Sequence, residues 1–340
     1  MTSASRSPGA RRPTIREVAG LAGLSHQTVS RHLRGDDTVN EAARARIDEA
    51  IARLGYRPSL LARAMRDRRT GRLAVALPSG LAVSSLAILD GVRQTAEAAG
   101  YTVEVITLSG APDARRARVL ELSDAGFFEG IVSLMPLPGL AAEEPRTPLL
   151  VVPRYDENMR SIGDLADASI LHEIMDRLAA GGHRRFLHLA GDHAHTSARE
   201  RRRVFEEAAV RLGAESYDVV DCDWDPGRAL EAIRGLPADG ATAVVAATDV
   251  LAAAAIRAAT ERGWQVPRDL SVTGWDDNPV AAVMLPSLTS VSHDHHMLGR
   301  HAAASLLAVL RGEAAPGEPG PIATVLWRES TGAAPVHERR

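Results

Sequence analysis

Residues 14–31 constrain the fold of this chain most, because they predict two short helices joined by a tight turn. Thr14 can cap the first helix, and Glu17, three residues later, completes a capping box. Apolar side chains then recur at helical spacing until Gly23 interrupts the pattern. Asn40 is a good N-cap for a third helix that runs to residue 55. The segment therefore predicts a small all-α domain.

The second of these helices, opened by Ser25 or Gln27, places Val29 and Leu33 on its buried side. Three polar side chains that can read DNA are left facing outward: His26, Gln27 and Arg31. The alternative is a generic three-helix bundle with solvated polar residues, because short helix pairs with glycine turns are common.

Charge is distributed unevenly along the chain. Residues 1–72 hold fifteen arginines against seven acidic residues, a net charge of +8, whereas the remainder carries −11 within an overall charge of −3. A basic head on an acidic body indicates nucleic-acid binding confined to the head.

The next segment, residues 59–71, predicts a short helix in which Leu61 and Met65 are surrounded by arginine. Such a segment suits insertion into a DNA minor groove, and a solvated linker is the alternative.

From residue 72 onward, strand and helix patterns alternate, which is typical of parallel sheets with helices on both faces. Two sets of four strands indicate two lobes, and the segment 290–327, with a helix at 297–311, is expected to cross back to the first lobe. The strands are predicted at 73–77, 102–107, 130–134 and 149–153, then at 186–190, 217–222, 243–247 and 270–274; helices are predicted at 85–99, 168–180, 197–212, 226–234 and 249–262. Ligands of such folds bind beyond the carboxyl ends of strands, so the cleft between the lobes is the expected site.

Polar and aromatic residues follow the strands of the second set: Arg199, Trp224, Thr248, Asp276 and His293. A carboxylate and a guanidinium can form directional bonds to sugar hydroxyls, and a tryptophan can cover the apolar face of the ring. The alternatives are an interlobe salt bridge or helix cap for Arg199 and Asp276, a core or surface aromatic for Trp224, and a structural hydrogen bond for His293.

Several function classes are excluded by what the sequence lacks. Cys222 is the only cysteine, so no intrachain disulfide is expected, and the run of residues 293–296 lacks the spacing of a metal site. We therefore expect no metal and no cofactor. Phosphate-binding glycine loops and a nucleophile elbow are absent, so we do not expect an enzyme. No signal peptide or membrane span is predicted, and we expect a cytoplasmic, nucleoid-associated protein. A sugar-binding protein without a DNA head is the distant alternative.

The chain resembles the LacI/GalR (lac repressor) family of bacterial transcription regulators over residues 13–328. The resemblance is carried, in order, by TIREVAGLAGLSHQTVSRHLRG, ARIDEAIARLGYRPS, ARAMRDRRTGRLAV, GGHRRFLHLAG, SARERRRVFEEA, DLSVTGWDDNPVA and PSLTSVSHD. It implies an α/β protein with an all-α helix-turn-helix head, a hinge helix and a two-lobed, periplasmic-binding-protein-like body of doubly wound parallel sheets. The implied domains are a disordered N-terminus (1–12), the head (13–58), the hinge (59–71), an effector-binding and dimerisation domain (72–328) and a flexible tail (329–340). Within the body, lobe 1 covers about 72–162 and 292–328, and lobe 2 about 163–291.

The resemblance also implies roles for particular residues. His26, Gln27 and Arg31 would face base edges, and Ala62 and Met65 would enter the minor groove, where Met65 replaces the usual leucine. Residues expected to bond phosphates or cap helices are Thr14, Ser25, Thr28, Ser30 and Asn40. Effector contacts are expected from Arg199, Trp224, Thr248, Asp276 and His293. His293 and Thr248 stand where the lac repressor has glutamine and asparagine, which leaves the identity of the ligand open.

The resemblance implies a homodimer that binds a near-palindromic operator. Its affinity for the operator would change when a small molecule closes the cleft. A repressor of carbohydrate-utilisation genes, released by a sugar or sugar-derived effector, is the favoured reading. The alternative within the family is a regulator that responds to a purine, a nucleoside or another corepressor.

Overall fold

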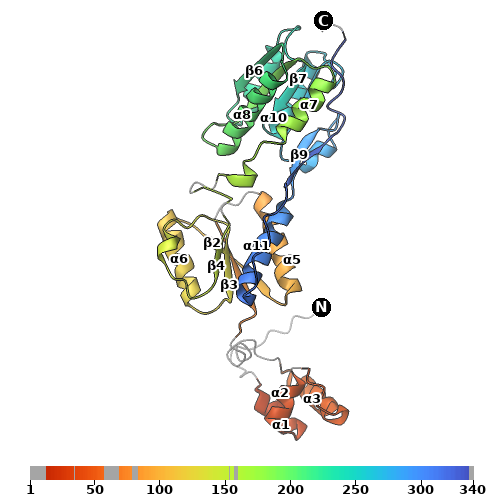
Figure 1. The fold of residues 1–340 in the computed structure, drawn as a ribbon. Helices are drawn as coiled ribbons and strands as arrows, with labels where there is room; N and C mark the ends of the chain where they lie inside the picture. The colour runs from red at the N-terminus through yellow and green to blue at the C-terminus, as the bar shows by residue number, and fades with distance from the viewer. Residues whose placement is uncertain are drawn as a thin grey trace. The chain divides into compact units, whose positions relative to one another are not determined.

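The computed structural model describes residues 13–33, 35–56, 69–78, 83–152, 154–156 and 160–336, and the chain divides into two compact units, Met1–Gly71 and Arg72–Arg340 (Figure 1). The predicted hinge residues Ala62 and Met65 lie outside the described residues, as do residues 1–12.

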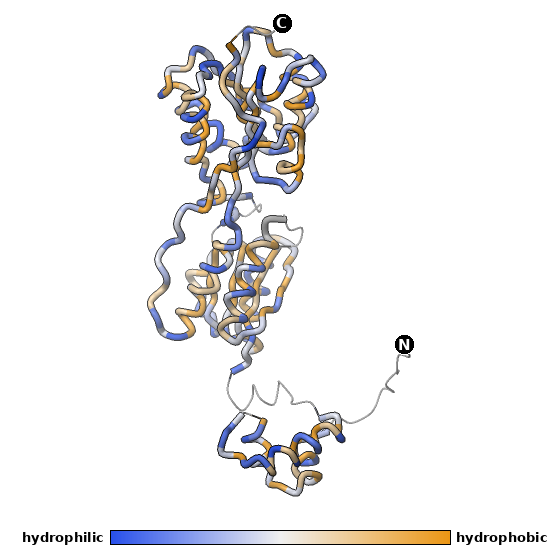
Figure 2. The backbone as a smooth tube through the Cα atoms, turned by 90° about the vertical axis from the view of Figure 1, so that its right-hand side faces the viewer, coloured by the Kyte–Doolittle hydropathy of each residue, from blue (hydrophilic) through white to orange (hydrophobic). Residues whose placement is uncertain are grey.

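The first unit consists of three helices, α1 (Ile15–Ala22), α2 (His26–His32) and α3 (Glu41–Leu54). Figure 2 shows hydrophobic and hydrophilic residues alternating along the backbone of this unit. The predicted capping box is present: Oγ1 of Thr14 accepts from the Glu17 amide at 3.4 Å, and the Glu17 carboxylate accepts from the Thr14 amide at 2.6 Å. Gly23 ends α1 in a left-handed conformation with φ 65°. The core of this unit is small and mostly aliphatic: Val18, Ala19, Ala22, Val29, Val39, Ala43, Ile47 and Ala50.

The second unit begins with a lobe built on a parallel sheet in the order β2-β1-β3-β4. Its elements are β1 (Arg72–Pro78), β2 (Thr102–Leu108), β3 (Gly130–Ser133) and β4 (Leu149–Val151), with α5 (Val83–Ala98), α6 (Pro112–Asp124), the short helix η1 (Leu140–Ala142) and α11 (His295–Arg311). Alternate side chains of β1 point to opposite faces. Leu73 and Val75 pack with α5 and α11, whereas Ala74 and Ala76 pack on the side of α6.

The second lobe repeats this plan with a parallel sheet in the order β6-β5-β7-β8. Its elements are β5 (Arg185–Ala190), β6 (Ser216–Asp221), β7 (Ala243–Ala246) and β8 (Ser271–Thr273), with η2 (Gly163–Leu165) leading into α7 (Leu171–Ala180), and with α8 (Thr196–Arg211), α9 (Pro226–Arg234), α10 (Asp249–Glu261) and η3 (Pro279–Ala282). Leu187 and Leu189 of β5 pack with α9 and α10, and Phe186 packs with α7 and α8. The predicted fold class, a helical head followed by two parallel sheets, is therefore confirmed.

The chain passes between the lobes again near its C-terminal end, through the antiparallel strands β9 (Ser290–His293) and β10 (Ala323–Leu326). The prediction that residues 290–327 cross back to the first lobe holds for α11, but β10 then leads to the second lobe, where Val325 and Trp327 join the core beside α7 and α8. This return of the chain to the second lobe was not predicted, because the short apolar pattern of β10 would be the same whichever lobe followed it.

The prediction of a flexible tail over residues 329–340 is wrong for its first part. Ser330 is fully buried; its carbonyl accepts from the Val272 amide at 2.8 Å, and its hydroxyl donates to the Val272 carbonyl at 2.6 Å. The amide of Ala334 donates to the carbonyl of Gly181 at 2.9 Å. Hydrogen bonds rather than apolar side chains fix this segment, so hydrophobic patterning gives no sign of it.

Candidate functional site

The second helix of the head presents the three side chains expected to read DNA. His26, Gln27 and Arg31 are all exposed, while Val29 on the opposite side of α2 is fully buried. Nη1 of Arg31 donates to the hydroxyl of Thr38 at 3.3 Å, which directs the guanidinium along the surface of the head. The arrangement leaves one polar face of a rigidly packed helix available to a partner.

The residues expected to bond phosphates have capping roles in the structure. Thr14, Ser25 and Asn40 are the N-caps of α1, α2 and α3, and Oγ of Ser25 lies 2.9 Å from Oγ1 of Thr28. Ser30 is half-buried. These caps fix the ends of the helices, and contacts of the five residues with phosphate stay a prediction.

In the second lobe, three of the predicted effector residues meet in one cavity of about 240 Å³. The loops at the carboxyl ends of β6, β7 and β8 and the start of α10 supply its lining, which is Trp224, Thr248, Asp249, Val250, Trp275, Asp276 and Asn278. This is the edge of a parallel sheet at which ligands are expected. The cavity belongs to the second lobe, so a site that also uses the first lobe stays a prediction.

Backbone strain marks two of these loops. Trp224 has φ 64° and Asp276 has φ 92°, and their neighbours Asp223 and Asp277 are also in the left-handed region. Residues other than glycine rarely adopt this backbone conformation, which costs them about 1–3 kcal/mol each. Such strain concentrates at ligand sites, where the surrounding structure holds it in place.

Trp224 packs directly on the loop that follows β5. A Cβ atom added at Gly191 would overlap the six-membered ring of Trp224, so only glycine allows the indole to lie there. The indole also meets the imidazole of His195 edge-on, with ring centroids 5.6 Å apart. Trp224 is thus a half-buried wall of the cavity, which fits a role in covering the apolar face of a ligand.

We expect the change Gly191→Ala to displace the Trp224 ring toward solvent, because the added methyl group occupies its place. The tryptophan emission spectrum of the variant should shift to longer wavelength, and the shift should vanish in a Trp224→Phe background. Gly317→Ala is the matched control, since a Cβ at Gly317 meets nothing within 4 Å. An unchanged spectrum for Gly191→Ala would show that the ring does not rest on this loop.

The arginine beside Asp276 is Arg201 and not Arg199. Nη2 of Arg201 lies 3.8 Å from Oδ1 of Asp276, and its guanidinium lies over the ring of Trp275 at 4.3 Å from the centroid. Arg199 is exposed and donates to the His193 carbonyl at 2.6 Å. The prediction of Arg199 as the effector arginine is thus corrected. The buried stripe of α8 (Ala198, Arg201, Phe205 and Ala208) could have identified Arg201 from its helical spacing.

Two histidines extend this cluster. The ring of His293 lies 5.6 Å from that of Trp275 and stacks with that of His295 at 5.9 Å. Burial lowers the pKa of His293 to about 4 and also lowers the pKa of His295, so both imidazoles are neutral near pH 7. His293 is not in the cavity lining but lies against it through Trp275, and its contact with an effector stays a prediction.

Four side chains of this cluster each have a buried nitrogen atom without a hydrogen-bond partner in the protein. The atoms are Nε of Arg201, Nε1 of Trp275, Nε2 of His293 and Nδ1 of His295. Buried polar atoms are normally hydrogen-bonded, so unpaired ones need a physical reason, such as a ligand or water. Burial lowers the pKa of Arg201 to about 10, which leaves it charged at neutral pH. The cluster therefore offers a cation, hydrogen-bond donors and the carboxylate of Asp276.

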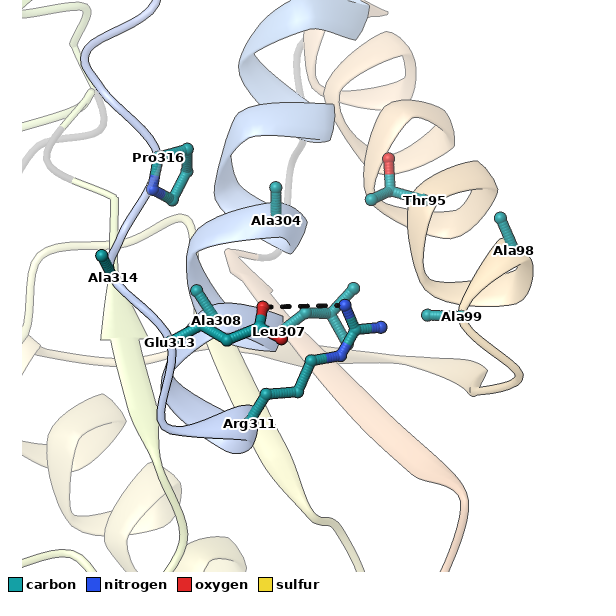
Figure 3. Close-up of a pocket in the computed structure, with 10 residues that line it drawn as sticks. All are labelled: Thr95, Ala98, Ala99, Ala304, Leu307, Ala308, Arg311, Glu313, Ala314 and Pro316. Carbon is teal, nitrogen blue, oxygen red and sulfur yellow. Dashed lines mark ion pairs between the residues drawn. The ribbon is translucent and has the colours of Figure 1, made fainter.

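A second cavity of about 440 Å³ lies in the first lobe, between α5 and α11 (Figure 3). Alanine side chains from both helices line it, and its charged side chains are Arg311 and Glu313, which form an ion pair at 3.9 Å. Both are exposed, so this cavity lacks the buried polar groups that would orient a ligand. Within the described ranges, no cluster of His, Cys, Asp and Glu could hold a metal ion, and no helix is long and apolar enough to cross a membrane.

Known proteins resemble both units of the chain. A family model described as "Bacterial regulatory proteins, lacI family" matches residues 14–59, and one described as "Periplasmic binding protein-like domain" matches residues 175–331. The transcriptional regulator CelR of Thermobifida fusca is 31% identical over 322 residues, which cover 89% of this chain and 93% of the relative.

Solved structures agree with these matches. The lac repressor dimer bound to operator and the anti-inducer ONPF has a TM-score of 0.72 and 25% identity, and the match covers 95% of this chain and all of that one. A CelR–cellobiose complex has a TM-score of 0.55 and 28% identity, covering 94% of this chain and 100% of that chain. The relative and the structures named here are transcription regulators.

Proposed function

Because the chain belongs to the LacI family of bacterial regulatory proteins, we propose that it is a transcriptional repressor that binds an operator as a homodimer and is released by a sugar. The observation that carries the proposal is the presence, in one chain, of helix α2 with an exposed polar face and of a cavity lined by two tryptophans and by Asp276. His26, Gln27 and Arg31 would contact base edges: arginine pairs well with guanine and glutamine with adenine. The proposal includes no catalytic role, and binding to chromosomal DNA would place the protein in the cytoplasm.

A sugar is the ligand class that best fits the cavity. Asp276 can accept from hydroxyl groups, Arg201 can donate to them, and Trp224 can cover the apolar face of a ring. The similarity to a CelR–cellobiose complex supports this class without identifying the sugar. Arg199 is no longer proposed as a contact, whereas Thr248 and His293 are kept at the edge of the site.

An exposed apolar patch near the cavity is proposed to receive a second copy of the chain. Its side chains are exposed by 52–92%: Val250, Val280, Val283 and Leu285. Val250 follows Asp249, whose carboxylate accepts from the backbone amide of Asn278 at 2.6 Å, so the start of α10 lies beside the start of η3. Symmetric half-sites in DNA require a symmetric protein, and the similar lac repressor is a dimer on its operator.

Effector binding would act on DNA through the hinge segment, where Ala62 and Met65 are proposed to enter the minor groove. Such a switch needs only a modest coupling free energy between the two sites. A coupling of about 1–3 kcal/mol changes operator affinity about 5- to 150-fold.

The DNA part of the proposal is tested by selection from a random duplex library with the full chain, followed by footprinting. We expect one recovered sequence with two half-sites related by a two-fold axis. Recovery of unrelated sequences, or of a single unrepeated half-site, would contradict binding as a symmetric dimer.

A further inference from the structure

The carboxylate of Asp249 is buried where the cavity, the loop that carries Asp276 and strand β9 meet. Its side chain accepts two hydrogen bonds. The Ser290 hydroxyl donates to Oδ1 at 2.5 Å, and the backbone amide of Asn278 donates to Oδ2 at 2.6 Å. Its own amide donates to the Trp275 carbonyl at 2.9 Å. Asp249 is only 4% exposed, so its carboxylate is committed to the protein rather than to solvent.

The backbone amides of the three residues after Trp275 all donate hydrogen bonds to Asp249 or to strand β9. The amide of Asp276 donates to the Val291 carbonyl at 3.0 Å, and that of Asp277 donates to the Ser290 hydroxyl at 3.0 Å. Ser290 thus accepts from Asp277 and donates to Asp249, which uses its single proton and joins the two aspartates. Strand β9, which leads to the first lobe, is bonded to the loop at two successive residues.

Arg328 links the same loop to the end of β10. Its Nη2 donates to Oδ1 of Asp277 at 2.7 Å, and its Nη1 donates to the Leu288 carbonyl at 2.7 Å. Its backbone amide donates to the hydroxyl of Thr289 at 2.8 Å. Both strands by which the C-terminal part of the chain passes between the lobes are therefore tied to the residues beside Asp276.

We propose that Asp249 is a positioning residue that holds the Asp276–Asn278 loop and transmits its position, through Ser290 and Arg328, to the crossover strands β9 and β10. Asp276 and Asp277 are both in the left-handed region, so the loop needs such external bonds to keep its shape. The network gives an effector that contacts Asp276 a route to the strands that join the lobes. The role of this network in signalling rests on the proposed function, but the network itself does not.

Hydrogen exchange of the full chain without any ligand tests the network. In Asp249→Ala the Asn278 amide loses its acceptor, so exchange in a peptide covering residues 274–280 should accelerate about tenfold or more. Exchange in a peptide covering residues 326–332 should also accelerate, because the Asp277 carboxylate that accepts from Arg328 is no longer held in place. Peptides from β5 should exchange at the wild-type rate, which distinguishes a local effect from general destabilisation.

Matched variants complete the test. Asp269→Ala is the control, because Asp269 also accepts a backbone amide in this lobe, that of Gln265 at 2.8 Å, away from the cavity. Asp249→Asn keeps one acceptor and should give an intermediate rate, and it decides the question if Asp249→Ala does not fold. Wild-type exchange at 274–280 would refute the positioning role, and acceleration there with no change at 326–332 would refute the transmission.

Cellobiose serves as the probe for the signalling role. If cellobiose alters operator binding by the wild type, we expect Asp249→Asn to weaken that response at least about fivefold, and Asp269→Ala to leave it unchanged. A full response in Asp249→Asn would overturn the signalling role. A wild type that ignores every sugar would instead contradict the proposed function, and the exchange result would still decide the network.

Discussion

Replacing Arg31 with alanine is expected to lower the preference of the protein for its operator about 5- to 150-fold, while weak binding to any DNA persists. A bidentate contact of arginine with guanine contributes about 1–3 kcal/mol of discrimination, whereas the affinity for phosphate comes from the whole basic head. The measurement is fluorescence anisotropy with the selected operator and with scrambled DNA over a range of salt concentrations.

Arg53→Ala is the matched control for this variant, because it removes the same charge from an exposed position on α3. It should weaken binding to both DNAs alike and leave their ratio unchanged. Wild-type selectivity in Arg31→Ala would show that α2 does not read the bases through this side chain.

The change Asp276→Ala is expected to give a protein that binds its operator normally but responds to its sugar only at concentrations at least about tenfold higher. Hydrogen bonds to a charged group contribute about 1.5–3 kcal/mol, and the change also leaves Arg201 without its carboxylate neighbour. The sugar to use is the one that raises the wild-type melting temperature in a panel that includes cellobiose, lactose and ribose.

Asp239→Ala is the control, because Asp239 is exposed on the turn between α9 and β7, which precedes a strand rather than following one. The melting temperature of the Asp239→Ala variant should rise on addition of the sugar, as that of the wild type does. A normal shift in Asp276→Ala would place the sugar elsewhere in the protein.

Much of the fold was predictable because apolar periodicity determines it. The strands of both sheets and the caps at Thr14 and Asn40 follow from local pattern. Helix α6 was not predicted, because its buried residues are Arg115, Val119 and Ser123, and only one of these is apolar. The docked segment around Ser330 was missed for the same reason, since hydrogen bonds hold it.

The candidate site was predictable in part. Strand ends located Trp224, Thr248 and Asp276, because parallel strands bring their carboxyl ends to one edge. The choice of Arg199 over Arg201 failed because alignment to a motif counts positions in sequence, whereas the helical face decides which arginine is buried. Asp249 and Ser290 lie far apart in the sequence, so only the fold brings them together.

The central claim, that this chain couples a sugar to an operator, is tested most directly by one measurement. The affinity of the full-length protein for its selected operator is measured with and without the sugar that stabilises it. The account predicts that the sugar weakens operator binding at least about fivefold and leaves binding to scrambled DNA unchanged. An operator affinity that stays the same at saturating sugar would contradict it.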